Sequence, residues 1–168
     1  MVKLNKSLLP EGTSIRNKID YQTGPVFRLL YNDCYGKCYI CEQKPIPPVV
    51  EHIIAHKGNP SLEFNWHNMF LACYYCNNVK NKALFYDGIV NPLEIDPEDF
   101  IILELSLDDL KEKVSITLKC ESESIAILET TIVLLDMVYN SSSNRDNQRV
   151  SSAHLKNKIS KCIRKFYL

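Results

Sequence analysis

Two Cys-x-x-Cys pairs, Cys38/Cys41 and Cys73/Cys76, are separated by 31 residues. Each pair sets two thiolates on a tight turn, close enough to share one tetrahedral ion. Two such pairs supply the four sulfurs of a closed structural zinc site. Four cysteines buried as small apolar residues are the alternative, which the metal-type spacing disfavours. Because the separation exceeds that of a small zinc ribbon, we expect the pairs to enclose further structure.

The residues between and just after the pairs have the chemistry of a catalytic centre. Histidine is the side chain best suited to accept a proton near neutral pH, which makes His52 a candidate general base. Carboxylate and amide oxygens are hard ligands that suit Mg²⁺ or Mn²⁺, so Glu51 and Asn77 are candidate ligands of a catalytic ion. Such a set can hydrolyse a phosphodiester. The alternatives are a core histidine at position 52 and a helix-cap residue at position 77.

Helices and strands must bring these side chains together. Val49–Ile54 reads as a strand, on which neighbouring residues point to opposite faces. Glu51 and His52 can therefore face one site only if the chain bends or bulges there. We expect helices over 26–33, from Cys76 onward, over 124–139 and over 146–166, and strands over 100–105 and 114–119. The sequence thus predicts an α+β protein: an N-terminal arm (1–30), a central module (31–90) and a mixed strand-helix extension (91–168).

Composition narrows the class of protein. The chain has 168 residues, of which 45% are hydrophobic, and no apolar run approaches the length of a membrane span. We expect a cytoplasmic protein with no membrane partner, in which cysteines bind metal rather than form disulfides. The formal net charge is zero. Residues 144–168 nevertheless carry seven bases against one acid, and 94–123 carry ten acids against three lysines. A basic end can meet phosphate or balance the acidic segment.

The 45 residues from Cys38 to Lys82 resemble the HNH nuclease family. The resemblance is carried by Glu51-His52, by Asn68, and by Asn77 directly after the last cysteine. Its ββα-metal fold implies a hairpin and a helix stapled by Zn²⁺ on the four cysteines. It further implies His52 as general base and Asn68 as the residue that braces the hairpin and orients this base. Glu51 and Asn77 would hold a catalytic Mg²⁺ or Mn²⁺.

The resemblance also implies substrate contacts, and the chain departs from the family pattern at two positions. Lys80 fits a family position and is a candidate phosphate contact. The alternative is that Lys80, like Lys82, is simply solvated. His56 is a second candidate substrate contact. The family more often has Asp at position 51 and a proline at position 55, which affects the expected fine geometry more than the activity.

The implied function is a sequence-tolerant endonuclease that acts on nucleic acid, DNA rather than RNA. Trp66-x-Asn68 and the segment 91–98 also resemble the HNH subunits of Septu-type antiphage defence systems, including retron-associated forms, which act beside an ATPase. Two alternatives stay open. One is a catalytically silent zinc-knuckle module that binds nucleic acid or protein. The other is a subunit that is active only with its ATPase partner.

Overall fold

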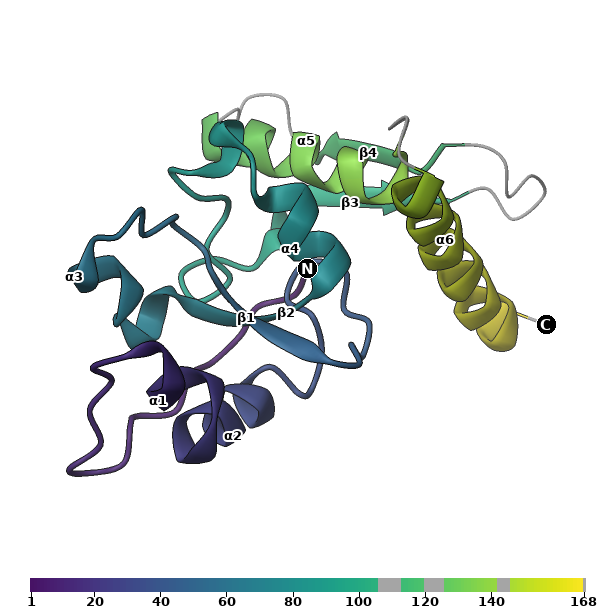
Figure 1. Cartoon of the computed structure of the whole chain (residues 1–168). Coiled ribbons are helices and arrows are strands. Elements are labelled where there is room, and N and C mark those ends of the chain that lie inside the picture. The colour runs from purple at the N-terminus through teal and green to yellow at the C-terminus, as the bar shows by residue number, and fades with distance from the viewer. Residues whose placement is uncertain (106–112, 120–125, 142–145, 168) are drawn as a thin grey trace. The chain divides into compact units, whose positions relative to one another are not determined.

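The computed structural model describes residues 1–105, 113–119, 126–141 and 146–167 (Figure 1). The chain forms two compact units, Met1–Glu98 and Asp99–Leu168. Their division falls inside the proline-containing segment 91–99. The acidic turn expected between the two C-terminal strands, at 106–112, lies outside the described residues.

A β-hairpin followed by a helix forms the centre of the N-terminal unit. Strands β1 (Pro48–His52) and β2 (Met69–Cys73) pair antiparallel, with Val50 opposite Leu71. Helix α4 (Tyr74–Lys80) begins directly after β2 and packs against both strands. The first four residues of β2 are fully buried, because α2 and α4 both pack on this strand. The predicted strand at 49–54 is confirmed, but it ends at His52.

Short helices complete this unit. The expected helix over 26–33 is confirmed as α2 (Gly24–Asp33). Two helices that we did not expect are α1 (Lys18–Gln22), which begins at a capping box formed by Asn17 and Asp20, and α3 (Pro60–Glu63), capped by Asn59. Three 3₁₀ turns are η1 (Trp66–Asn68), η2 (Ala83–Phe85) and η3 (Pro97–Asp99).

The N-terminal segment belongs to the same unit and is anchored by polar contacts. The Lys6 ammonium donates hydrogen bonds to the carbonyls of Trp66 and Met69, and lies over the Trp66 ring at 4.3 Å from its centroid. The Trp66 indole, buried as expected of a core aromatic, donates to the Ser7 carbonyl at 3.0 Å. This segment therefore braces the chain just before Asn68. Burial lowers the pKa of Lys6 to about 7, against the opposing effects of the nearby Cys34 and Asp33.

The C-terminal unit contains a second hairpin and two helices. Strands β3 (Ile101–Glu104) and β4 (Ser115–Leu118) pair antiparallel, and helix α5 (Ala126–Tyr139) packs on β4 and on α6 (Asp146–Tyr167). The hydroxyls of Thr130 and Thr131 donate to the carbonyls one turn earlier, so both hydroxyls have a partner within the helix. The expected strands and helices of this unit are confirmed, and so is the α+β class.

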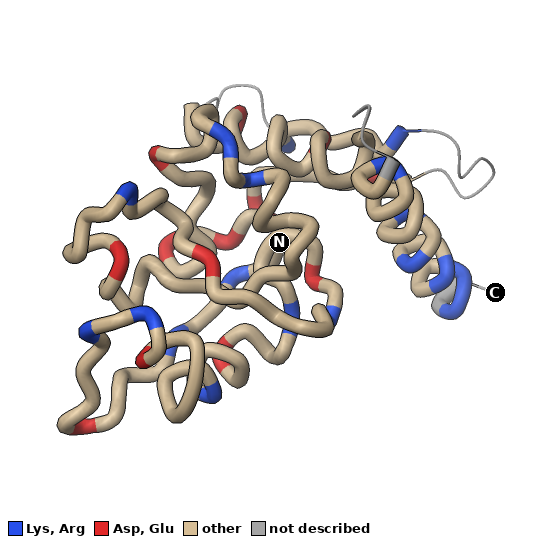
Figure 2. Tube along the Cα trace, in the orientation of Figure 1, with Lys and Arg blue, Asp and Glu red and all other residues tan. Residues whose placement is uncertain are grey.

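Basic residues concentrate on α6 (Figure 2). This helix carries six lysines and arginines against the single acid Asp146. His154, Lys158, Lys161 and Lys165 are exposed and recur at helical spacing, so they share one face. None of the helices in the described part of the chain is long and apolar enough to span a bilayer.

Candidate metal centre and catalytic pocket

The four cysteines of the two pairs converge in space. Their sulfurs all lie within 4.8 Å of one another, and Cys41 Sγ is 3.9 Å from Cys73 Sγ. In a tetrahedral site with Zn–S bonds of 2.3 Å, sulfurs are separated by about 3.8 Å. Cys38, Cys41 and Cys76 are buried and Cys73 is partly buried. This cluster could hold a metal ion such as zinc, as the spacing predicts.

The four thiols of the cluster differ in acidity: the pKa is lowered at Cys38 and Cys73 and raised at Cys41 and Cys76. The Cys73 side chain caps α4 by accepting from the Cys76 amide at 3.3 Å. Hydrogen bonds from the neighbouring thiols, with that from Cys38 the largest, lower the pKa of Cys73. A thiolate is the form that ligates metal. Cys34, four residues before the first pair, is instead a buried thiol outside the cluster, and burial raises its pKa to about 11.

A pocket of about 630 Å³ lies beside β1 and α4. Of the residues singled out in the sequence, Glu51, His52, His56, Asn77 and Lys80 line it. Glu51 and His52 thus reach one pocket although they are neighbours on a strand, because β1 ends at His52 and the chain bends away. Asn68 is not part of the lining.

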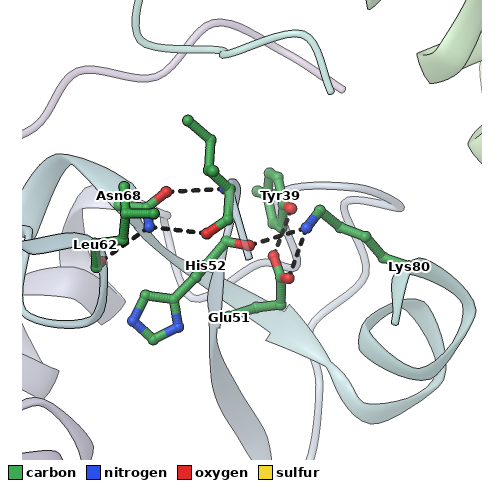
Figure 3. A network of polar contacts seen from close by, with 7 residues as sticks. Tyr39, Glu51, His52, Leu62, Asn68 and Lys80 are labelled. Carbon is green, nitrogen blue, oxygen red and sulfur yellow. Dashed lines mark hydrogen bonds and ion pairs between the residues drawn. The ribbon is translucent and has the colours of Figure 1, made fainter. Parts of the chain in front are cut away.

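Glu51 has a protein partner at each carboxylate oxygen (Figure 3). The Lys80 ammonium lies 2.9 Å from Oε1, and the Tyr39 hydroxyl donates to Oε2 at 2.6 Å. Lys80 also donates to the His52 carbonyl at 2.9 Å. Burial raises the pKa of Glu51, while Lys80 and Tyr39 act in the opposite direction. Lys80 is only 3% exposed, so the alternative that it is simply solvated is wrong.

His52 is held in a defined tautomer. Its Nε2 lies 2.8 Å from the Glu63 carbonyl, which can only accept, so Nε2 carries the proton. Nδ1 is then the basic nitrogen. Tyr21 packs edge-on against the imidazole, with ring centroids 5.6 Å apart. Burial lowers the pKa of His52 and outweighs the opposing effect of the Glu63 carbonyl, and the nearby His56 lowers it further, so the ring is neutral at pH 7.

Asn68 fixes the chain that follows His52. Its Oδ1 accepts from the Ile54 amide at 2.9 Å, and its Nδ2 donates to the carbonyls of Ile54 and Leu62 at 3.0 and 2.9 Å (Figure 3). The backbone carbonyl of Asn68 accepts from the Ile53 amide. The side chain is only 4% exposed. Asn68 therefore determines where the strand ends and at what angle the next residues leave it.

Asn77 and His56 lie at the pocket wall. Asn77 is half-buried on α4, one residue after the cluster cysteine Cys76. The His56 ring lies 4.9 Å from the His52 ring, and its Nδ1 is 3.6 Å from a Glu63 carboxylate oxygen. His56 is half-buried, so a ligand in the pocket can reach it.

Three contributions to this site were not predicted from sequence: those of Tyr21, Tyr39 and Glu63. Tyr39 lies inside the first cysteine pair, and its separation from Glu51 gives no local pattern that would pair them. Glu63 acts through its backbone carbonyl, which any residue provides. One signal in the sequence could have indicated Tyr39. It lies between Cys38 and Cys41, and Lys80 lies one helical turn after Cys76, so an ion shared by the two cysteine pairs would bring Tyr39 and Lys80 close together.

No family profile, curated protein or solved structure matches this chain. The functional reading therefore depends on the residues and their geometry.

Proposed function

We propose that this chain is an HNH-type endonuclease that hydrolyses phosphodiester bonds in a sequence-tolerant manner, with DNA as its substrate. The observation that carries the proposal is the oriented histidine: a neutral imidazole, fixed by a backbone carbonyl at one nitrogen, on the wall of a pocket that also holds a carboxylate and an amide. The hairpin, helix and cysteine cluster around it support the ββα-metal fold of this family.

His52 would act through Nδ1. A water beside the imidazole gives up a proton to Nδ1 as its oxygen attacks the phosphorus atom, and the Glu63 carbonyl stabilises the imidazolium through Nε2–H. Asn68 keeps the ring at the required angle by fixing the backbone after it. His56, on the same wall, would contact the substrate phosphate.

The pocket also offers ligands for a divalent cation. A carboxylate has about four lone-pair positions, and Lys80 and Tyr39 take two of those on Glu51. The remaining positions and the Asn77 amide oxygen are hard ligands, which fit Mg²⁺ or Mn²⁺ with water completing the shell. When bound, this ion would stabilise negative charge on the departing 3′ oxygen. Zn²⁺ on the four cysteines would have a structural role and contribute to folding free energy.

Binding to nucleic acid would rely on the phosphate backbone rather than on base edges. The exposed lysines of α6 provide a charge suited to phosphates, and counterion release would make their contribution dependent on salt. From the resemblance of 66–68 and 91–98 we further propose a role in antiphage defence beside an ATPase partner. Co-purification from cells that express both proteins tests this assignment.

Nicking of supercoiled plasmid in Mg²⁺ or Mn²⁺ tests the nuclease. We expect cleavage by the wild-type chain and loss of at least 100-fold in His52→Ala, a typical contribution of a general base. The matched control is His67→Ala, because His67 is exposed in the same segment and does not line the pocket. Equal cleavage by all three proteins would contradict the proposal. Absence of cleavage by a zinc-loaded wild type would instead favour a binding module.

A further inference from the structure

The Lys80–Glu51 ion pair is buried beneath the pocket. The side chains of Lys80 and Glu51 are 3% and 9% exposed, and both nevertheless line the pocket wall. A lysine is almost never buried this completely unless a charged partner neutralises it. The ammonium has three donors, two of which go to Glu51 Oε1 and the His52 carbonyl. The pair is therefore a buried structural element of the pocket rather than a surface contact.

The ammonium binds the same carboxylate that we propose as a metal ligand. A divalent cation at Glu51 and the ammonium at 2.9 Å would repel each other in a poorly solvated site, where such interactions are strong. A divalent ion on Glu51 is thus bound more weakly while the ion pair is in place than after the ammonium has left. Lys80 is the final residue of α4 and carries its ammonium on a flexible four-carbon stem, so the charge can move while the helix stays in place.

We infer that Lys80 is a displaceable counter-ion: its ammonium holds Glu51 in place of a divalent cation, leaves when the cation binds, and then turns into the pocket toward the substrate phosphate. This inference rests on the proposed function. It assigns Lys80 two successive partners, the Glu51 carboxylate and a phosphate oxygen. It also makes Lys80 a determinant of metal affinity, because every binding event must break the ion pair.

Chemical labelling of lysines follows this exchange without measuring activity. The protein is treated with an amine-acetylating reagent at increasing Mn²⁺, and acetylation at each lysine is measured by mass spectrometry. We expect Lys80 to be protected at first and to gain at least fivefold in labelling. The Mn²⁺ concentration at which Lys80 labelling is half-maximal should match the dissociation constant for Mn²⁺ measured by electron paramagnetic resonance. Lys82, exposed two residues later, is the internal control and should label equally throughout.

A substitution provides the second measurement. Lys80→Met keeps the length of the side chain and removes its charge, so we expect Mn²⁺ to bind at least tenfold more tightly than to wild type. Lys82→Met makes the same change in net charge at an exposed position and should leave the affinity unchanged. Zinc content and thermal unfolding identify a variant that fails to fold. In that event the labelling of the wild-type chain still decides the question.

The outcomes separate this inference from the proposed function. Mn²⁺ binding with Lys80 still protected, or unchanged affinity in folded Lys80→Met, overturns the exchange and leaves the nuclease intact. Loss of both Mn²⁺ binding and plasmid cleavage in the zinc-loaded wild type overturns the two together. Cleavage with no detectable Mn²⁺ or Mg²⁺ binding overturns the exchange alone.

Discussion

The Tyr39 hydroxyl donates a hydrogen bond of 2.6 Å to Glu51 Oε2, and both groups are buried. Tyr39 lies between Cys38 and Cys41, and its ring stacks on Phe70 with centroids 4.8 Å apart. The other partner of Glu51, Lys80, lies one helical turn after Cys76. The turn that holds the first cysteine pair and the helix that holds Cys76 therefore each supply one hydrogen-bond donor to the Glu51 carboxylate. The cysteine cluster and the candidate catalytic pocket are thus linked through Glu51.

Tyr39→Phe should weaken this link while leaving the cluster intact. The change removes one charge-assisted hydrogen bond and keeps the stacked ring, so we expect unfolding free energy to fall by about 1.5–3 kcal/mol. We also expect slower cleavage, because Glu51 loses one of the two groups that orient it. Urea unfolding and plasmid nicking measure the two effects. Tyr35→Phe, at an exposed tyrosine, should change neither. Loss of zinc from Tyr39→Phe would show that Tyr39 supports the whole cluster instead.

Removing the metal should unfold the N-terminal unit selectively. Without an ion, the four sulfurs no longer connect the first cysteine turn to α4. The binding free energy of structural zinc commonly contributes directly to folding. We expect about one zinc ion per chain, lost in Cys73→Ser together with protease resistance of residues 31–90. Cys162→Ser, at an exposed cysteine on α6, should retain both. A zinc-free chain that keeps its protease resistance would show that packing alone holds this unit.

Cleavage should follow the protonation of His52. Burial, His56 and Lys80 lower its pKa, so the basic form should already predominate below the ordinary histidine value of about 6.5. The rate should rise with pH through this lowered pKa and level off before neutrality.

The effect of His52 on the free energy of unfolding has the same sign as its effect on the rate. The contribution of His52 is constant above about 6.5 and declines as pH falls through the folded pKa, because the unfolded chain then binds the proton more readily. A midpoint at or above 6.5 in the rate profile would contradict a buried base.

Much of this architecture was predictable, because it depends on local patterns. The cysteine spacing predicted a metal cluster, which the sulfur positions support. The strand around Val49 followed from its β-branched residues, and the helix before Cys34 followed from apolar spacing. Helix α5 forms despite its threonines because its buried apolar residues pack on β4 and α6, and such packing outweighs local propensity.

The environment of Lys80 was not predictable from sequence. At the end of a helix, next to Asn81 and Lys82, it reads as a solvated residue. It is buried because β1 brings Glu51, 29 positions earlier, beneath it. Such a pairing depends on tertiary packing and leaves no periodic signal. Helices α1 and α3 were missed for a different reason: they are too short to show an apolar period and depend on asparagine caps.

Asn68→Ala tests whether the asparagine acts on His52 through the backbone. The substitution leaves the amide and carbonyl of Ile54 and the carbonyl of Leu62 without these partners, at a cost of about 1–3 kcal/mol in unfolding free energy. We expect kcat to fall at least tenfold, because the angle at which the chain leaves His52 relaxes, while zinc content stays the same. Asn78→Ala, at an exposed position on α4, is the matched control. If zinc is lost along with activity, Asn68 supports the whole module rather than the base.

Charge reversal on α6 tests how the chain holds its substrate. Lys158 and Lys161 are exposed on one face, and each phosphate contact that they make should release about 0.9 counterions. The double variant Lys158→Glu/Lys161→Glu should therefore weaken duplex DNA binding and reduce the slope of log affinity against log salt by roughly 1–2. Lys113→Glu/Lys119→Glu makes the same change in net charge at exposed positions flanking β4, and should have a smaller effect. Equal losses in the two variants would mean that net charge alone governs binding. An unchanged slope in the α6 variant, measured by fluorescence anisotropy over a salt series, would remove this helix from the interface and leave the N-terminal unit to hold the substrate.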